Sequence, residues 1–280
     1  MIFLLFLVFP AHASEDTLTA ITYNIESGPD TDPAVVARKM AQAPSPNIWL
    51  LQEAPHEEAV LSIMNWIGGK RWAYVLSDTG ERIEPFKQAD YLAVLYDRSA
   101  LRLLETVELV ETSYLPGAYG DVDPDDTLRR VQFLRFEHFA SGAEFWISNL
   151  HQRCCAGFEG LREHQSKITM DWVTERSVPV ILGGDFNIPV EPGTNGNSDS
   201  NAFSAITDSL SWISPSNPVR TLCIVGQTSM VDHFFVTPSL REIASTTILF
   251  EEPEYCELDP DGHADHRPVM LELELTSSVE

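Results

Sequence analysis

Side chains that can bind cations, orient water or transfer protons recur at the ends of apolar, strand-like segments of the 280-residue sequence. In the stretch VILGGDFNIP, for example, a buried strand is followed by two glycines and then by Asp185 and Asn187. The residues at such places are Asn24, Glu53, His151, Asp185, Asn187, Asp232, Asp265 and His266. Open α/β sheets collect ligands beyond the carboxyl ends of their strands. Any one of these residues alone is better explained as a cap, a turn former or a core side chain, but together they predict one polar site.

Strand and helix patterns alternate along the chain and position these residues. Strands are predicted, from alternating or continuous apolar residues, in segments 17–26, 47–55, 71–77, 91–99, 130–139, 143–151, 178–184, 228–238 and 266–275. Helical spacing predicts helices over 32–43, 56–69, 159–176 and 202–212. Asp32 followed by Pro33 is typical of a helix start. The sequence contains no evident repeat or linker, so we predict one α/β domain.

Six short motifs carry a resemblance to a known family. They are TYNIE, LLQEAP, SNLH, GGDFN, MVDHFFV and ADHRP. In this order and rough spacing they resemble the motifs of the endonuclease/exonuclease/phosphatase superfamily, from about Thr19 to Leu275. The resemblance implies a four-layer sandwich of two mixed β-sheets flanked by helices, with the site at one end of the sheets. It also implies a metal-dependent phosphoester hydrolase.

A divalent cation is expected at the acidic part of the site. Phosphoester hydrolysis builds charge on the phosphoryl oxygens, and a cation relieves that charge. Oxygen donors from Asn24 and Glu53 suit a hard octahedral ion, so Mg²⁺ or Mn²⁺ is favoured over Zn²⁺. By resemblance to the family's metal shell, Glu26 and Asp265 complete the set, directly or through water.

The remaining polar residues are expected to handle protons and phosphate oxygens. Asp232 is the natural partner of His266, because a carboxylate that holds one imidazole nitrogen orients the other toward water. His151 and Asn187 resemble the family's donors to phosphate oxygens. Asp185 resembles the residue that aids the leaving group or positions the water. The glycines before Asp185 are predicted to let the chain turn and admit the phosphate.

The charge balance limits the substrates. The sequence has 18 Lys and Arg against 42 Asp and Glu, a formal net charge of -24. Tight binding of a long polyanion usually depends on basic residues that neutralise phosphates. A broad basic surface is therefore not expected, and a small or singly contacted phosphate ester fits better. The acidity is equally compatible with a salty habitat or simple solubility.

The first residues predict export. Residues 1–13 combine the apolar run Ile2–Phe9 with Ala11-His12-Ala13, a small-x-small pattern typical of signal-peptide cleavage, although no Lys or Arg precedes the run. We therefore predict a signal peptide over 1–13, a catalytic domain over 14–280, and a periplasmic or secreted location. The run is shorter than the roughly 20 residues that span a bilayer, so no stable membrane anchor is expected.

The cysteines are predicted to form disulfides, as is usual in an exported chain. Adjacent cysteines rarely bridge each other, which favours pairing of Cys154 and Cys155 with Cys223 and Cys256, in either combination. A metal site is disfavoured because the sequence lacks a CxxC spacing.

The sequence therefore predicts an exported, monomeric, metal-dependent enzyme that hydrolyses phosphodiesters, with nucleic acid among the candidate substrates. Two other enzymes remain open: a phosphatase of small phosphomonoesters and a sphingomyelinase-like lipid phosphodiesterase. The lipid enzyme would need an apolar loop for membrane contact, for which the loop at 114–127 is a weak candidate. A non-catalytic binding module on the same scaffold would be expected to lack Glu53 or the Asp232 and His266 pair, and this chain keeps all three.

Overall fold

The fold is taken from a computed structural model that describes residues 16–26, 31–78, 82–83, 88–113, 130–194, 200–256 and 263–275. The predicted signal peptide (1–13) and the loop 114–127 lie outside the described residues, so the structure bears on neither prediction.

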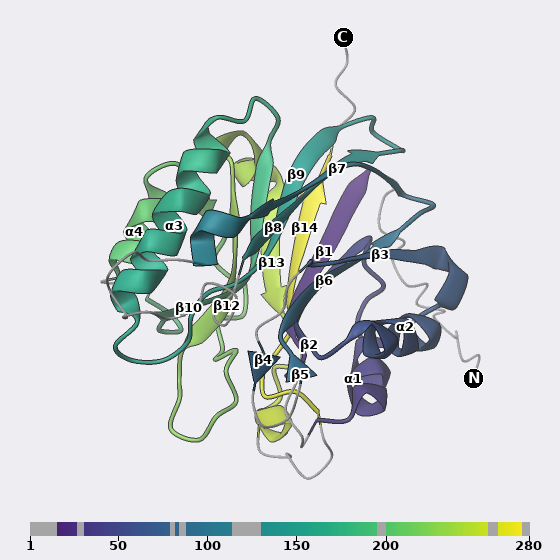
Figure 1. The fold of residues 1–280 in the computed structure, drawn as a ribbon, viewed down its shortest axis with the longest axis horizontal. Coiled ribbons are helices and arrows are strands. Elements are labelled where there is room, and N and C mark those ends of the chain that lie inside the picture. The colour runs from purple at the N-terminus through teal and green to yellow at the C-terminus, as the bar shows by residue number, and fades with distance from the viewer. Residues whose placement is uncertain are drawn as a thin grey trace, which may run out of the picture.

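Most strands of the described chain belong to two six-stranded mixed sheets that pack face to face (Figure 1). The first sheet has the order β13 (Ala244–Ile248), β14 (Val269–Glu274), β1 (Thr17–Asn24), β2 (Ile48–Ala54), β6 (Tyr91–Asp97), β3 (Trp72–Leu76). The second has the order β11 (Ser211–Trp212), β12 (Met230–Val236), β10 (Val180–Val190), β9 (Glu144–His151), β8 (Val131–His138), β7 (Leu101–Leu109). β1 pairs with β2 and β9 with β10 in parallel, and the other neighbours are antiparallel.

Helices cover the outer faces of the sheets (Figure 1). α1 (Pro33–Met40) and α2 (Glu57–Trp66) lie against the first sheet, and α3 (Glu159–Thr174) and α4 (Asn201–Thr207) against the second. The smaller elements are the ribbon β4 (Arg82–Ile83) and β5 (Gln88–Ala89) and the 3₁₀ turns η1 (Gly69–Arg71), η2 (Val110–Ser113), η4 (Pro238–Ile243) and η5 (Pro253–Cys256). The four-layer α/β sandwich expected from the resemblance is confirmed. None of the described helices is long and apolar enough to cross a membrane.

The alternation predicted for β1 determines which layer each side chain enters. Ile21, Tyr23 and Ile25 pack with α1 and α2 in one apolar cluster. Leu18 and Ala20, on the other face, pack between the sheets. Asn24 shares the face of Leu18 and Ala20 and therefore lies at the end of the interior between the two sheets.

Several elements differ from the prediction: the helix predicted over 202–212 ends at Thr207 and is followed by the strand β11 (Ser211–Trp212), and the short strands β4 and β5 were not predicted. β7 and β13 are edge strands that carry charged or hydroxyl residues and lack a strong apolar pattern, so neither was predicted. β10 was expected to end at Gly184 but continues to Val190 through an irregular register after Asp185. Such a register shift is a tertiary feature that apolar periodicity does not report.

The glycines before Asp185 serve packing, and the prediction that they turn the chain is wrong. A Cβ on Gly183 would lie 2.5 Å from Phe234 and 2.7 Å from Leu50, whose side chains come from the two sheets. Gly184 has φ +150°, and a Cβ there would lie 2.2 Å from the carbonyl oxygen of Leu150. Both glycines therefore allow close approach of neighbouring strands and side chains within the sandwich.

This packing predicts a strong effect of one methyl group. We expect Gly184→Ala to lower the free energy of unfolding by at least about 3 kcal/mol, because the Leu150 carbonyl belongs to the backbone of β9 and cannot move aside. Denaturant unfolding measures this. The control Gly142→Ala, with φ +69° and open space at Cβ, should lose only about 1 kcal/mol; equal losses in the two variants would contradict the packing argument.

Candidate active site

The structure brings all the predicted site residues to one end of the sandwich. Asn24 ends β1, Glu53 lies near the end of β2, and His151 ends β9. Asp232, however, lies near the amino end of β12, and Asp265 and His266 precede β14. The expectation that every site residue lies at the carboxyl end of a strand is thus wrong for these three, because β12 and β14 run antiparallel to their partners β10 and β1 and begin where those strands end. Asp185 and Asn187 lie within β10, which continues to Val190.

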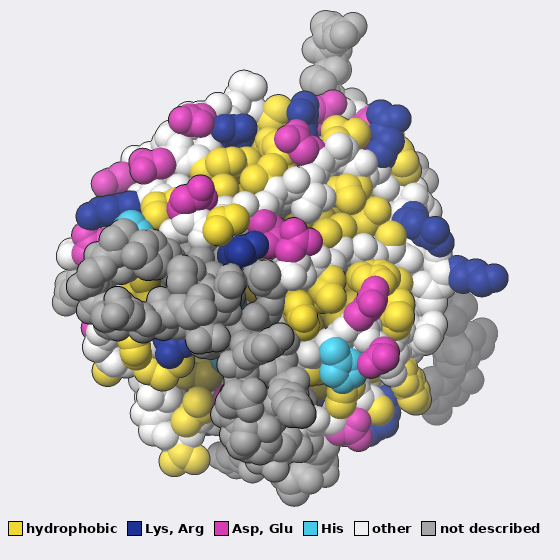
Figure 2. Space-filling model, viewed as in Figure 1, with side chains coloured by type: hydrophobic (Ala, Val, Ile, Leu, Met, Phe, Trp, Pro, Cys, Tyr) yellow, Lys and Arg dark blue, Asp and Glu magenta, His cyan; other side chains and the backbone are white. Residues whose placement is uncertain are grey.

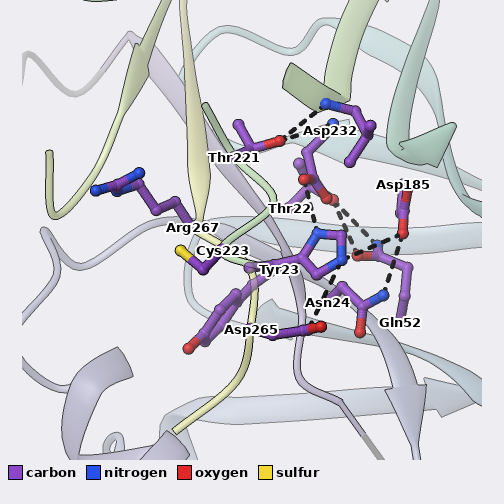
Figure 3. Close-up of polar contacts among 12 residues, drawn as sticks. Thr22, Tyr23, Asn24, Gln52, Asp185, Thr221, Cys223, Asp232, Asp265 and Arg267 are labelled. Atoms are coloured by element: carbon purple, nitrogen blue, oxygen red, sulfur yellow. Dashed lines mark hydrogen bonds and ion pairs between the residues drawn. The ribbon is translucent and has the colours of Figure 1, made fainter. Parts of the chain in front are cut away.

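Asp232 and His266 form the pair expected from the sequence, and Figure 3 shows Asp232 gathered with Asn24, Asp185 and Asp265. The Nδ1 atom of His266 lies 2.9 Å from Asp232 Oδ2, and both side chains are buried. The other imidazole nitrogen, Nε2, lies 3.8 Å from both Asp185 Oδ2 and Asp265 Oδ1. A buried carboxylate that fixes Nδ1 sets the orientation of the ring and leaves Nε2 for proton transfer.

The carboxylates around this pair shift its proton equilibria. Burial lowers the pKa of His266, but the negative charges of Asp232 and Asp185 outweigh it and hold that pKa well above the ordinary value. Burial, together with the charge of Asp232, raises the pKa of Asp185 to about 7. His266 and Asp185 therefore tend to hold protons near neutral pH in the absence of a cation. A cation bound to the same carboxylates would favour their ionised forms.

Next to this pair, Asn24, Glu26, Glu53 and Asp265 form a connected acidic cluster. The Asn24 amide nitrogen donates to Glu53 Oε1 (2.9 Å) and to Asp185 Oδ2 (3.1 Å), and its oxygen accepts the Glu26 N–H (3.0 Å). Glu26 Oε2 accepts the Asp265 N–H at 3.0 Å. Burial and the charge of Asp265 raise the pKa of Glu26 to about 7, and burial raises the pKa of Asp265.

This cluster fits a hard divalent cation. Its donors are carboxylate oxygens, which Mg²⁺ and Mn²⁺ prefer, and a bound cation would offset their mutual repulsion. We predict that the carboxylates of Glu26, Glu53 and Asp265 hold it; among the described residues, the acid and histidine groups whose potential ligand atoms all lie within 4.8 Å of one another are Glu53 with Asp90 and His151, and Asp185 with Asp232 and His266. The oxygen of Asn24 accepts one backbone N–H and keeps a second lone pair, so Asn24 stays a predicted ligand while its nitrogen orients two carboxylates.

Backbone irregularities aim several of these side chains. Glu26, Glu53 and Asn187 have φ of 50°, 55° and 50°, in the left-handed region that non-glycine residues seldom adopt. Glu53 lies where the register of β2 against β6 shifts, and Asn187 where β10 is irregular against β12. Bulges of this kind redirect side chains beside active sites, and such strain persists only where the surrounding structure holds it.

His151 adjoins the acidic cluster, together with an acid that the sequence analysis missed. His151 Nε2 lies 3.4 Å from Asp185 Oδ2 and 3.8 Å from Glu53 Oε1. Potential ligand atoms of Glu53, His151 and the buried Asp90 all lie within 4.8 Å of one another. Asp90 directly precedes β6, which runs antiparallel to β2, so its place before a predicted strand was the only available signal.

A buried amide network between the sheets supports the site and was also missed. Gln52 Nε2 donates to Asn149 Oδ1 (2.7 Å), and Asn149 Nδ2 donates to the carbonyls of Leu51 (2.9 Å) and Ala93 (3.2 Å). The network joins β2 and β6 to β9 close behind Glu53 and His151. Because a buried amide is costly unless it is hydrogen-bonded, the pairing fixes the register of the two sheets at the site.

The disulfide pairing expected from the sequence is wrong. Cys223 bonds to Cys256, while Cys154 and Cys155 are thiols that line the pocket. The bridge joins two segments that hold the backbone of the site: the Cys223 N–H donates to the Asp265 carbonyl (2.6 Å), and the Tyr255 hydroxyl to the His266 carbonyl (3.0 Å). This proximity is created by the fold and cannot be deduced from spacing.

The comparisons with known proteins agree with this geometry. A model of the Endonuclease/Exonuclease/phosphatase family matches residues 21–253. The chain belongs to this family. Its members hydrolyse phosphoesters with the help of divalent metals, and the chain is accordingly a phosphoric ester hydrolase. No curated protein sequence matches it significantly.

Solved structures share the fold at low identity. An endonuclease/exonuclease/phosphatase from Bacteroides vulgatus is 18% identical with a TM-score of 0.65, covering 92% of this chain and 99% of its own. Bacteroides thetaiotaomicron mannosyl-6-phosphatase is 18% identical with a TM-score of 0.64, covering 91% and 99%. The human Nocturnin catalytic domain is 16% identical with a TM-score of 0.68, covering 93% and 95%.

The raised pKa of Asp185 predicts a pH-dependent stability. Between its ordinary pKa of 3.8 and about 7, Asp185 binds more protons in the folded state, so its contribution to the free energy of unfolding falls as pH rises through that window. Asp185→Asn removes this loss. The melting temperatures of Asp185→Asn and wild type are compared in chelator. The difference between them, variant minus wild type, should increase by a few degrees from pH 5 to pH 8. The exposed control Asp171→Asn should show no such trend; a pH-independent difference for Asp185→Asn would contradict the raised pKa.

Proposed function

We propose that this protein is an exported, monomeric phosphodiesterase that uses Mg²⁺ or Mn²⁺ to hydrolyse a small phosphodiester. The observation that carries the proposal is the buried Asp232–His266 pair, at 2.9 Å, beside the acidic cluster around Glu53. A proton-transfer pair next to a cation-binding cluster is what attack of water on a phosphoester requires.

In this account each side chain has one task. Asp232 holds Nδ1 of His266, and Nε2 would accept a proton from the attacking water once a bound cation offsets the carboxylate charge that keeps the imidazole protonated. Asp185, whose Oδ1 accepts the Asn187 N–H at 2.9 Å, supplies a second proton-binding group beside that nitrogen. His151 and Asn187 lie at the pocket surface as donors to phosphoryl oxygens. When bound to Glu26, Glu53 and Asp265, the cation would neutralise charge on those oxygens.

The charge of the pocket favours a diester over a monoester. Its lining includes Glu53, Glu159, Asp185 and Asp265 but, among the described lining residues, a single Lys or Arg, namely Arg162. A monoester dianion would meet more repulsion there than a singly charged diester. The mannosyl-6-phosphatase that shares the fold makes the phosphomonoesterase the second candidate.

Nucleic acid is the less favoured substrate. The net charge is -24, and on the face drawn in Figure 2 the Lys and Arg side chains lie singly or in small groups among acidic and apolar ones. One fold relative, D. rerio TDP2, is in complex with a single-stranded DNA product, so a nuclease stays among the alternatives to be tested. The intact Asp232–His266 pair argues against a non-catalytic binding module.

Export is supported by two features. The Cys223–Cys256 disulfide is typical of oxidising compartments. The apolar run Ile2–Phe9 and the small-x-small pattern Ala11-His12-Ala13 resemble the apolar region and cleavage site of a signal peptide, although no Lys or Arg precedes the run.

A pair of chromogenic esters tests the proposal. We expect wild type to hydrolyse bis(p-nitrophenyl) phosphate in Mg²⁺ or Mn²⁺, faster than p-nitrophenyl phosphate, and to lose activity in chelator. His266→Ala should lower kcat by about 100-fold or more, because it removes the proton-transfer group. Glu53→Gln should lower it too, and raise the cation concentration needed for half-maximal rate.

His164→Ala is the matched control, because His164 lies on α3 and does not line the pocket; it should keep full activity. A preference for the monoester would replace the proposal by the phosphatase. Metal-independent turnover, or full activity of His266→Ala, would contradict the mechanism.

A further inference from the structure

The pocket at the active site has an acidic floor and apolar walls. Its volume is about 510 Å³. The floor consists of Glu53, His151, Asp185, Asn187, Asp265 and His266. Beyond it the pocket is bordered by Pro189, Leu222, Ile224 and Val231 and by Cys154, Cys155 and Ala156. Glu159, Arg162 and Gln227 complete the lining, so a substituent on a phosphate held at the floor meets a border of mainly apolar groups with these three polar side chains among them.

The loop 221–229 carries apolar side chains at the rim of the pocket. Ile224 is 48% exposed, and Val225 beside it is 97% exposed. Isolated exposed apolar residues need no explanation, but Ile224 lines the pocket and Val225 follows it in the loop, so a long apolar ligand group that extends out of the pocket past Ile224 would reach both.

This loop is firmly anchored, so the apolar rim has a defined position. Cys223 is bonded to Cys256, and the Thr221 N–H donates to the Ser229 carbonyl at 3.2 Å. The Gln227 N–H donates to the Ile224 carbonyl at 3.1 Å and closes the tip. At the far side of the loop, the Ser229 hydroxyl donates to Glu191 at 2.8 Å. The apolar surfaces of Ile224 and Val225 are thus held in water, and they would gain free energy from burial only when a ligand covers them.

The one basic side chain of the described pocket lining is occupied. Arg162 is buried, and its Nη1 donates to the carbonyls of Arg153 (2.9 Å) and Cys155 (3.0 Å). Its Nη2 lies 3.6 Å from Glu159. Arg162 thus holds the loop of Cys154 and Cys155 in place, and its bonds leave it poorly placed to receive a second phosphate.

We propose that the substrate is a phosphodiester with an apolar substituent, alkyl or aryl, on the phosphate, and that Ile224 and Val225 contact this substituent and determine specificity. The inference rests on the proposed function, since it concerns the same site. It names the class of ester: one charged phosphate at the floor and an apolar group along the wall.

Two soluble esters with one leaving group test this. Methyl p-nitrophenyl phosphate and hexyl p-nitrophenyl phosphate both release p-nitrophenolate, so they differ only in the substituent that meets the wall. A methylene fully removed from water contributes about a factor of four in binding, and about a factor of two at a half-open wall. We expect wild type to favour the hexyl ester in kcat/KM by at least about tenfold, with substrate kept below its aggregation concentration.

The variant Ile224→Ser/Val225→Ser should lower this hexyl-to-methyl ratio to within about threefold of unity. The matched control is Phe139→Ser, because Phe139 is 50% exposed and lies in the turn between β8 and β9, at the opposite end of β9 from His151. That variant should keep the wild-type ratio.

The outcomes separate this inference from the proposed function. If wild type hydrolyses neither ester with metal, the proposed function fails. If it hydrolyses both with equal kcat/KM, or if the double variant keeps the wild-type ratio, the function stands and the apolar wall does not select substrate. A hexyl preference that emerges only with added phospholipid vesicles would assign the loop to a membrane surface and overturn the proposal.

Discussion

The crowding of carboxylates in a partly or fully buried site, where each is poorly solvated and repels the others, is the constraint on which the rest of the site depends. Glu26, Asp185 and Asp265 all have raised pKa values because complete or partial burial disfavours their ionised forms, and acidic neighbours add to the effect. A fold that gathers such groups must hold them firmly. It does so with Asn24, which donates to two carboxylates, and with strained backbone at Glu53. The same repulsion makes the cluster attractive to a divalent cation.

The two sheets supply the rigidity that this cluster needs. Gly183 allows Leu50 and Phe234 to meet between the sheets, and the Gln52–Asn149 hydrogen bond fixes their relative position next to the site. On the other side, Tyr255 and the Cys223–Cys256 bridge hold the backbone of Asp265 and His266. Sheet packing and site geometry are therefore parts of one arrangement.

The sequence predicted which residues form the site more accurately than it predicted where those residues lie along their strands. Strand-end polarity and motif order led to Asp232, His266 and Glu53, and the α/β sandwich followed from the resemblance. The sequence could not reveal Asp90, because an acid before a strand acquires meaning only once that strand is known to run antiparallel. The pairing of Cys223 with Cys256 could not be predicted either, because it depends on the fold. Both cysteines lie beside segment 263–267, which comes later in the chain.

The central claim is that the acidic cluster binds a divalent cation, and calorimetric titration of Mn²⁺ into wild type and Glu53→Gln tests it most directly. The account predicts saturable binding by wild type at pH 8, weakened at least about tenfold in the variant. At pH 6.5 binding should release about one proton, because groups with pKa values near 7 must ionise. Absence of binding to wild type, or equal binding by Glu53→Gln, would contradict the claim.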